Sequence, residues 1–189
     1  MEAFLVSTGV VVLAEMGDKT QLLALLLAVR FCRPVPIIAG IFVATIINHT
    51  IAGAVGTWIT ATVGPHVLRW ALGASFIGMA IWTLIPDKLD SEESKIARFG
   101  VFGATVLAFF LAEMGDKTQI ATVALAAKYS AFYTVVAGTT FGMMLADVPA
   151  VLLGDRVTRM VPVRRIRLVA AAVFLILGAT ALLNVGRLL

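Results

Sequence analysis

An eight-residue stretch, Ala14-Glu15-Met16-Gly17-Asp18-Lys19-Thr20-Gln21, occurs a second time without change as Ala112-Glu113-Met114-Gly115-Asp116-Lys117-Thr118-Gln119. The spacing between the two copies also aligns other residues, among them Gly40 with Gly138, Gly56 with Gly154 and Phe76 with Phe174. Self-similarity at one fixed spacing is typical of a duplicated unit. The chain is therefore predicted to consist of two related halves, each with one copy of this motif.

The composition predicts that both halves lie in a membrane. Of the 189 residues, 60% are hydrophobic and 14% are charged, whereas soluble domains average about 45–50% and about 25%. Such a chain has too little polar surface for a soluble particle. This excludes a soluble enzyme, a disordered segment and a nucleic-acid-binding domain, despite the net charge of +4. The single cysteine, Cys32, excludes an internal disulfide and a cysteine-based metal site.

Six apolar stretches approach or exceed the roughly 20 residues that a helix needs to cross a bilayer. They are Ala3–Val29, Val35–Val63, Val67–Ile85, Phe99–Ala127, Ala131–Leu153 and Leu168–Val185. The long polar stretch at residues 87–98 is predicted to be a cytoplasmic linker. It divides the chain into a first three-helix repeat, residues 1–86, and a second three-helix repeat, residues 99–189.

Because each repeat has an odd number of spans, the second must enter the membrane from the opposite side. The predicted fold class is an all-α membrane protein with six transmembrane helices arranged as two inverted three-helix repeats, a plan that many secondary transporters share. Most lysines and arginines fall in the loops of one side, including Arg30, Arg33 and several at 156–167. Cytoplasmic loops carry such an excess, so we expect both termini outside the cytoplasm.

The motif places two acidic side chains inside the first predicted span and two inside the fourth. Ionisable groups at this depth face the protein interior or a water-filled cavity. On a continuous helix, Glu15 and Asp18 share one face with an axial rise of about 4.5 Å. The four carboxylates and the lysines Lys19 and Lys117 leave two negative charges uncompensated, which one divalent cation or two protons would balance. The alternative is that lysine–acid pairs only lock the helices together.

Oxygen ligands of this kind suit Mg²⁺, Ca²⁺ or Mn²⁺. Met16 and Met114 either add a softer sulfur that favours Mn²⁺ or pack between helices, which we favour. Gly17 and Gly115 permit either close helix approach or local unwinding. The predicted metal-binding residues are Glu15, Asp18, Glu113, Asp116, Thr20, Thr118, Gln21 and Gln119.

Further polar residues inside the predicted spans are auxiliary candidates. His49 aligns with Asp147 at the repeat spacing, so both could complete the site from the flanking helices. Asp147 is either a proton carrier or the partner of a lysine. The full set of auxiliary or proton-coupling candidates is Asp147, Asn48, His49, Lys19 and Lys117.

The duplicated Glu-Met-Gly-Asp-Lys-Thr-Gln block resembles the Gdt-type cation transporter family, whose signature Glu-x-Gly-Asp-(Lys/Arg)-(Thr/Ser) is present twice. That family includes Golgi and chloroplast manganese/calcium transporters and bacterial manganese exporters. The resemblance covers essentially the whole chain and implies a secondary transporter that exports a divalent cation, with Mn²⁺ expected, in exchange for protons. It also implies that the protein lies in a bacterial inner membrane. The family's acidic positions fall on Glu15, Asp18, Glu113 and Asp116.

Two rival transport functions stay open, a Ca²⁺/H⁺ exchanger and a passive divalent-cation channel, since acidic rings also select cations. An intramembrane aspartyl protease is excluded because Met16 and Met114 stand where its glycine pattern requires glycine. We therefore predict no enzymatic activity. No cofactor is expected besides the transported cation; the expected partners are this cation, protons, the lipid bilayer and further copies of the chain.

Overall fold

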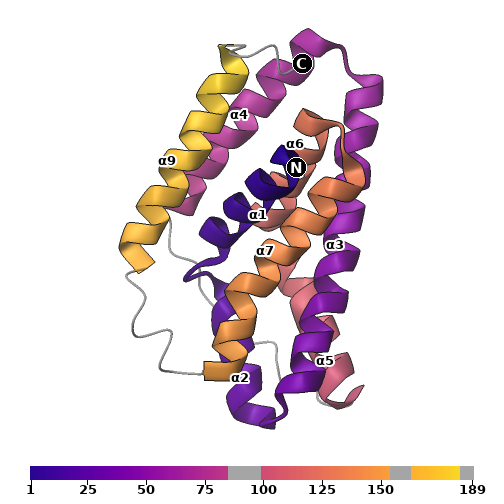
Figure 1. Cartoon of the computed structure of the whole chain (residues 1–189), viewed down its shortest axis with the longest axis vertical. Helices are drawn as coiled ribbons and strands as arrows, with labels where there is room; N and C mark the ends of the chain where they lie inside the picture. Colours follow the sequence, from indigo (N-terminus) through magenta and orange to yellow (C-terminus); the bar gives the residue numbers. More distant parts are fainter. Residues whose placement is uncertain (85–98, 154–162, 184–189) are drawn as a thin grey trace.

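The structure is a computed structural model that describes residues 1–84, 99–153 and 163–183 (Figure 1). Within these ranges it contains helices and no strands, so the all-helical prediction is confirmed. The helices are α1 (Glu2–Glu15), α2 (Lys19–Phe31), α3 (Pro34–Thr62), α4 (Pro65–Thr83), α5 (Gly100–Glu113), α6 (Lys117–Tyr129), α7 (Phe132–Leu153) and α9 (Val163–Leu182). The predicted linker at 87–98 and the basic residues Arg156, Arg159 and Arg187 lie outside the described residues.

The first and fourth predicted spans are not continuous helices. α1 ends at Glu15 and α2 begins at Lys19, and the same interruption separates α5 from α6. Gly17 has φ +79° and Gly115 has φ +76°, a left-handed conformation that a right-handed helix cannot contain and that glycine adopts readily. The expectation of one helix face carrying Glu15 and Asp18 is therefore wrong. Of the two roles considered for the motif glycines, local unwinding is the one observed.

Two described helices, Pro34–Thr62 and Phe132–Leu153, are long and apolar enough to cross a membrane. They correspond to the second and fifth predicted spans. Gly100–Glu113 and Leu168–Leu182 are shorter apolar helices. The interruptions at the motifs explain why α1, α2, α5 and α6 have only 13 or 14 residues each.

The buried apolar side chains form two clusters, and the motifs lie where these clusters meet. One cluster draws on α1, α4, α6 and α9 together with Val135 of α7, and the other on α2, α3, α5 and the rest of α7. Because α1 and α2 belong to different clusters, as do α5 and α6, each motif loop passes from one cluster to the other. In Figure 1, α1 and α7 occupy the middle of the bundle, and α4 and α9 form a pair along one flank.

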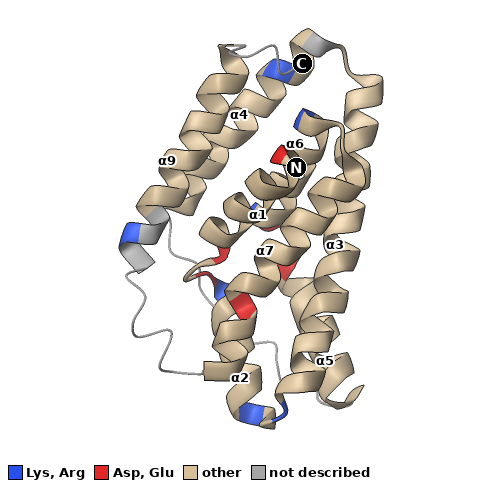
Figure 2. Ribbon diagram, in the orientation of Figure 1, with Lys and Arg blue, Asp and Glu red and all other residues tan. Residues whose placement is uncertain are grey.

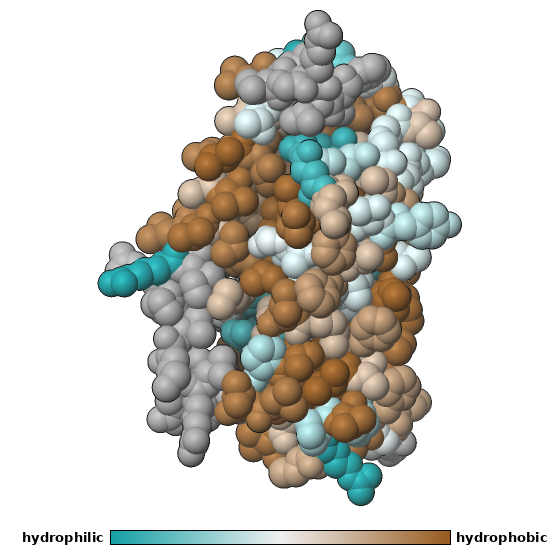
Figure 3. Space-filling view, in the orientation of Figure 1, coloured by the Kyte–Doolittle hydropathy of each residue, from teal (hydrophilic) through white to brown (hydrophobic). Residues whose placement is uncertain are grey.

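The outer surface carries many large apolar side chains. Leu5, Trp58, Val67 and Ile81 are all more than half exposed, and brown, hydrophobic atoms cover large parts of the face in Figure 3. A surface of this kind favours lipid over water. Charged residues in Figure 2 are found near the outer ends of the helices and around the middle of the bundle, where α1 ends.

α7 packs closely on α1 through glycine. A Cβ on Gly142 would lie 2.7 Å from the carbonyl oxygen of Thr8, so Gly142→Ala should force the helices apart and lower the free energy of unfolding by about 1–3 kcal/mol. Thermal unfolding in detergent measures this effect. Gly9→Ala on α1 is the control, because nothing lies within 4 Å of the added atom. Equal melting temperatures for the two variants would contradict the close packing.

Candidate cation site

The acidic residues of the motif stand at the ends of four short helices. Glu15 and Glu113 are the last residues of α1 and α5, and Asp18 and Asp116 precede α2 and α6 as N-caps. The C-terminal end of a helix is partially negative. A glutamate at that end therefore strengthens a field that attracts cations, whereas an aspartate at an N-terminus is compensated by the helix itself.

The motif glutamines hold the unwound loops in shape. The backbone N–H of Gly17 donates to Oε1 of Gln21 at 2.9 Å, and that of Gly115 donates to Oε1 of Gln119 at 2.7 Å. Gln21 also donates through Nε2 to the carbonyl oxygen of Ala146 on α7, at 3.1 Å. The amide oxygens that were predicted as metal ligands thus accept hydrogen bonds from the motif backbone.

Each motif threonine is bonded to the glutamate of its own half. Thr20 Oγ1 donates to Oε2 of Glu15, and Thr118 Oγ1 donates to Oε2 of Glu113 at 2.7 Å. All four side chains are buried. The second oxygen of each glutamate, Oε1, accepts no hydrogen bond from any described residue. These two oxygens are therefore available to a cation or a proton.

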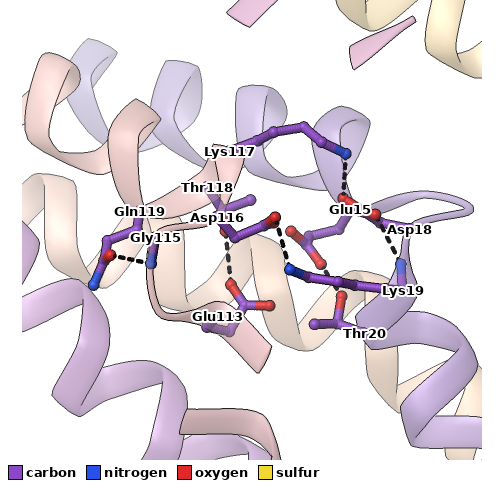
Figure 4. A network of polar contacts seen from close by, with 10 residues as sticks. All are labelled: Glu15, Asp18, Lys19, Thr20, Glu113, Gly115, Asp116, Lys117, Thr118 and Gln119. Carbon is purple, nitrogen blue, oxygen red and sulfur yellow. Dashed lines mark hydrogen bonds and ion pairs between the residues drawn. The ribbon is translucent and has the colours of Figure 1, made fainter. Parts of the chain in front are cut away.

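The motif lysines pair with the aspartates of the opposite half. Lys117 Nζ lies 2.8 Å from Oδ2 of Asp18, and Lys19 Nζ lies 3.1 Å from Oδ1 of Asp116 (Figure 4). The Lys19 side chain is 25% exposed, while that of Lys117 is 3% exposed. The two ion pairs balance the aspartates and join the two motif loops. They leave the charges of Glu15 and Glu113 without a lysine partner among the described residues.

Three of the acids converge on one point. Carboxylate oxygens of Glu15, Glu113 and Asp116 all lie within 4.8 Å of one another. Oxygen ligands about 2.0–2.6 Å from a hard divalent cation lie at most about 5 Å apart, so this spacing fits one ion. Asp18 is not a member of this group and is held by Lys117. The arrangement therefore offers oxygens of both halves to one divalent cation or to protons.

The auxiliary candidates are buried in the helices that flank the motifs. Asn48 on α3 donates through Nδ2 to the carbonyl oxygen of Phe110 on α5, at 3.2 Å. Neither ring nitrogen of His49 and neither carboxylate oxygen of Asp147 has a hydrogen-bond partner among the described residues. The carbonyl groups of Phe110 and Ala146 could not be predicted as acceptors, because nothing in a sequence marks a particular carbonyl. Met114 is 54% exposed, so it is not enclosed with the acids.

Two interrupted helices that meet at a buried group of acids, inside a bundle with an apolar exterior, are features of a secondary transporter for cations. The chain matches the family described as "Divalent cation/proton antiporter GDT1" over residues 3–91 and 101–187. It therefore belongs to this family, which is a family of transporters and not a class of enzymes. Since an antiporter acts across a membrane, the chain is a membrane protein.

Relatives of known sequence agree with this assignment. A "Putative manganese exporter" of Vibrio cholerae is 51% identical over 183 residues, which cover 96% of this chain and 91% of the relative. The GDT1-like protein sll0615 of Synechocystis is 28% identical, covering 92% and 93% of the two chains. The GDT1-like protein 5 of Arabidopsis thaliana is 26% identical, covering 97% and 96%. No solved structure matches the chain.

Proposed function

We propose that the protein exports Mn²⁺ from the cytoplasm of a bacterium across its inner membrane, in exchange for protons. The observation that carries this proposal is the convergence of Glu15, Glu113 and Asp116 within 4.8 Å, next to two ion pairs that balance both aspartates. The charges left over are those of the two glutamates, and one divalent cation or two protons balance them equally well. Mutually exclusive binding of this kind couples the two fluxes.

Alternating access requires two halves that can exchange roles, and the packing supports such a relation. α1 packs on α7 and α5 packs on α3, while α2 packs on α7 and α6 packs on α3. These four contacts thus form two pairs, in each of which a contact of one half has its counterpart in the other. We propose that the chain has six membrane spans in two inverted repeats, with the first and fourth spans interrupted at the motifs. Arg30 and Arg33 near the end of α2 would then face the cytoplasm, and both termini would lie outside it.

Mn²⁺ is favoured over Ca²⁺ by the name of the Vibrio cholerae relative, which shares about half of its residues with this chain. Oxygen ligands alone accept either ion, so Ca²⁺/H⁺ exchange is the second candidate function. Competition between the two ions in one assay separates these candidates.

Reconstituted vesicles test the proposed function. With an acidic lumen and equal Mn²⁺ on both sides, the purified chain should accumulate Mn²⁺ inside and raise the luminal pH in step. A Mn²⁺-sensitive dye and a pH dye in the lumen measure the two fluxes, and protein-free vesicles are the control. A channel would give Mn²⁺ flux only down its own gradient, with no linked pH change. Stronger accumulation of Ca²⁺ than of Mn²⁺ would overturn the choice of ion.

A further inference from the structure

Asp147 on α7 is an acid that the motif does not contain. Its side chain is 0% exposed, and neither of its carboxylate oxygens accepts a hydrogen bond from a described residue. A buried carboxylate without a partner is costly to keep ionised. Its chemistry therefore depends on which charges and protons lie nearby.

The position of Asp147 links it to the motif without making it part of the acidic cluster. Gln21 donates a hydrogen bond to the carbonyl oxygen of Ala146, so the first turn of α2 is bonded to the residue next to Asp147. The carboxylates that lie near enough to Asp147 to interact with it electrostatically are those of Asp18, Glu15 and Glu113. Asp147 is not among the three acids whose oxygens lie within 4.8 Å of one another, and no hydrogen bond joins it to them.

A lysine partner for Asp147, one of the two roles considered from the sequence, is not what the contacts show. Lys19 is paired with Asp116 and Lys117 with Asp18, and no ion pair to Asp147 exists among the described residues. α7 packs against α1, α2, α3 and α6. Apart from residues at the outer helix ends, the ionisable groups on these elements and in the motif loops are Glu15, Asp18, Lys19, His49, Asp116 and Lys117.

We propose that Asp147 binds one of the protons that are exchanged for the metal, an inference that rests on the proposed function. With the aspartates of the motif balanced by lysine, three carboxylates respond to the cargo: Glu15, Glu113 and Asp147. A divalent cation and two protons change the charge of this set equally. When the metal arrives, its field favours the ionised form of Asp147, whose O–H bond breaks and whose proton passes to water. When the metal leaves, Asp147 takes a proton from water, and a second proton binds a glutamate oxygen.

Asp147→Asn tests this role because asparagine keeps the shape of the side chain and cannot lose a proton. In the vesicles described above, isotopic Mn²⁺/Mn²⁺ exchange at equal pH should stay within about twofold of the unmodified protein. Accumulation driven by a pH gradient should fall by about tenfold or more, and the ratio of protons to metal should drop from about two to about one. Asp147→Glu, which restores a titrating group, should recover part of the driven accumulation.

Thr45→Val on α3 is the matched control, since Thr45 is also buried and its hydroxyl has no hydrogen-bond partner among the described residues. It should leave both assays unchanged. The proposal would be overturned if Asp147→Asn accumulated Mn²⁺ in a pH gradient as strongly as the unmodified protein. The proposal would also be overturned if Asp147→Asn lost Mn²⁺/Mn²⁺ exchange and driven accumulation to the same degree, while its elution in size-exclusion chromatography matched that of the unmodified protein. Asp147 would then act in the binding of the metal. An absence of proton coupling in the unmodified protein would instead refute the proposed function.

Discussion

Glu113→Gln should abolish metal transport while the helices stay packed. Glutamine keeps the acceptor for the Thr118 hydroxyl, which binds Oε2 at 2.7 Å, but it removes one of the two motif charges that no lysine balances. The remaining charge no longer matches a divalent cation, and an amide N–H directed at the cluster repels the metal. Removing a charged partner from a buried polar interaction costs about 3 kcal/mol, so Mn²⁺ flux should fall by about 100-fold.

The measurement is Mn²⁺ uptake in vesicles, together with Mn²⁺ resistance of cells that depend on the protein. Glu15→Gln should give the same loss, because Glu15 is the counterpart of Glu113 in the first half. Glu2→Gln is the matched control: the same chemical change at an exposed acid whose contact is Tyr129. Undiminished transport by Glu113→Gln would refute the cluster as the binding site.

Exchanging the two partners of one ion pair that joins the halves, Lys19 and Asp116, should restore the stability that either single change destroys. Lys19→Asp places a second acid beside Asp116, and Asp116→Lys places a second ammonium beside Lys19. Each single variant should lose transport and have a lower free energy of unfolding. The loss of free energy should be smaller than the about 3–5 kcal/mol typical of a fully buried pair, because the Lys19 side chain is 25% exposed. The double variant should regain a coupling energy of about 0.5–3 kcal/mol.

This pair suits the exchange better than Lys117 and Asp18. The carboxylate of Asp18 also accepts a hydrogen bond from the backbone of Lys19 at 2.7 Å and so caps α2, whereas the Asp116 side chain makes no cap bond. Thermal unfolding measures the recovery; vesicle transport should stay lost, because Asp116→Lys removes a member of the acidic cluster. The control is the exchange within one motif, Lys19→Asp with Asp18→Lys, which should recover nothing. Equal recovery by this control would contradict the pairing of lysine with the opposite half.

The sequence alone predicts the helical class, and it names as candidates the four motif acids, of which the structure brings three together. The boundaries of Val35–Val63 and Ala131–Leu153 agree closely with α3 and α7, because proline, glycine or polar residues stand at the ends of these long apolar runs. For the first span the sequence left close helix approach and local unwinding at Gly17 both open, because the apolar run from Ala3 to Val29 outweighed a local signal. That signal was Gly17 followed by Asp18, a residue that favours helix N-caps.

The crossed ion pairs could not be predicted in the same way. In the sequence Lys19 is next to Asp18. Only the relative position of the two motif loops in space brings the Lys19 ammonium to Asp116. The same is true of Asp147, for which the sequence left both a lysine partner and a proton role open. Only the placement of both lysines shows that neither of them pairs with Asp147.

The crossed arrangement of lysines and aspartates also constrains how such a duplicated gene can diverge. A substitution of Asp18 removes the ion-pair partner of Lys117, and a substitution of Lys19 removes that of Asp116. Nearly one hundred residues separate the members of each pair. Neither copy of the motif can therefore accumulate substitutions at these positions independently of the other. Among related sequences, compensating substitutions should therefore link the two copies to each other more tightly than they link neighbours within one copy.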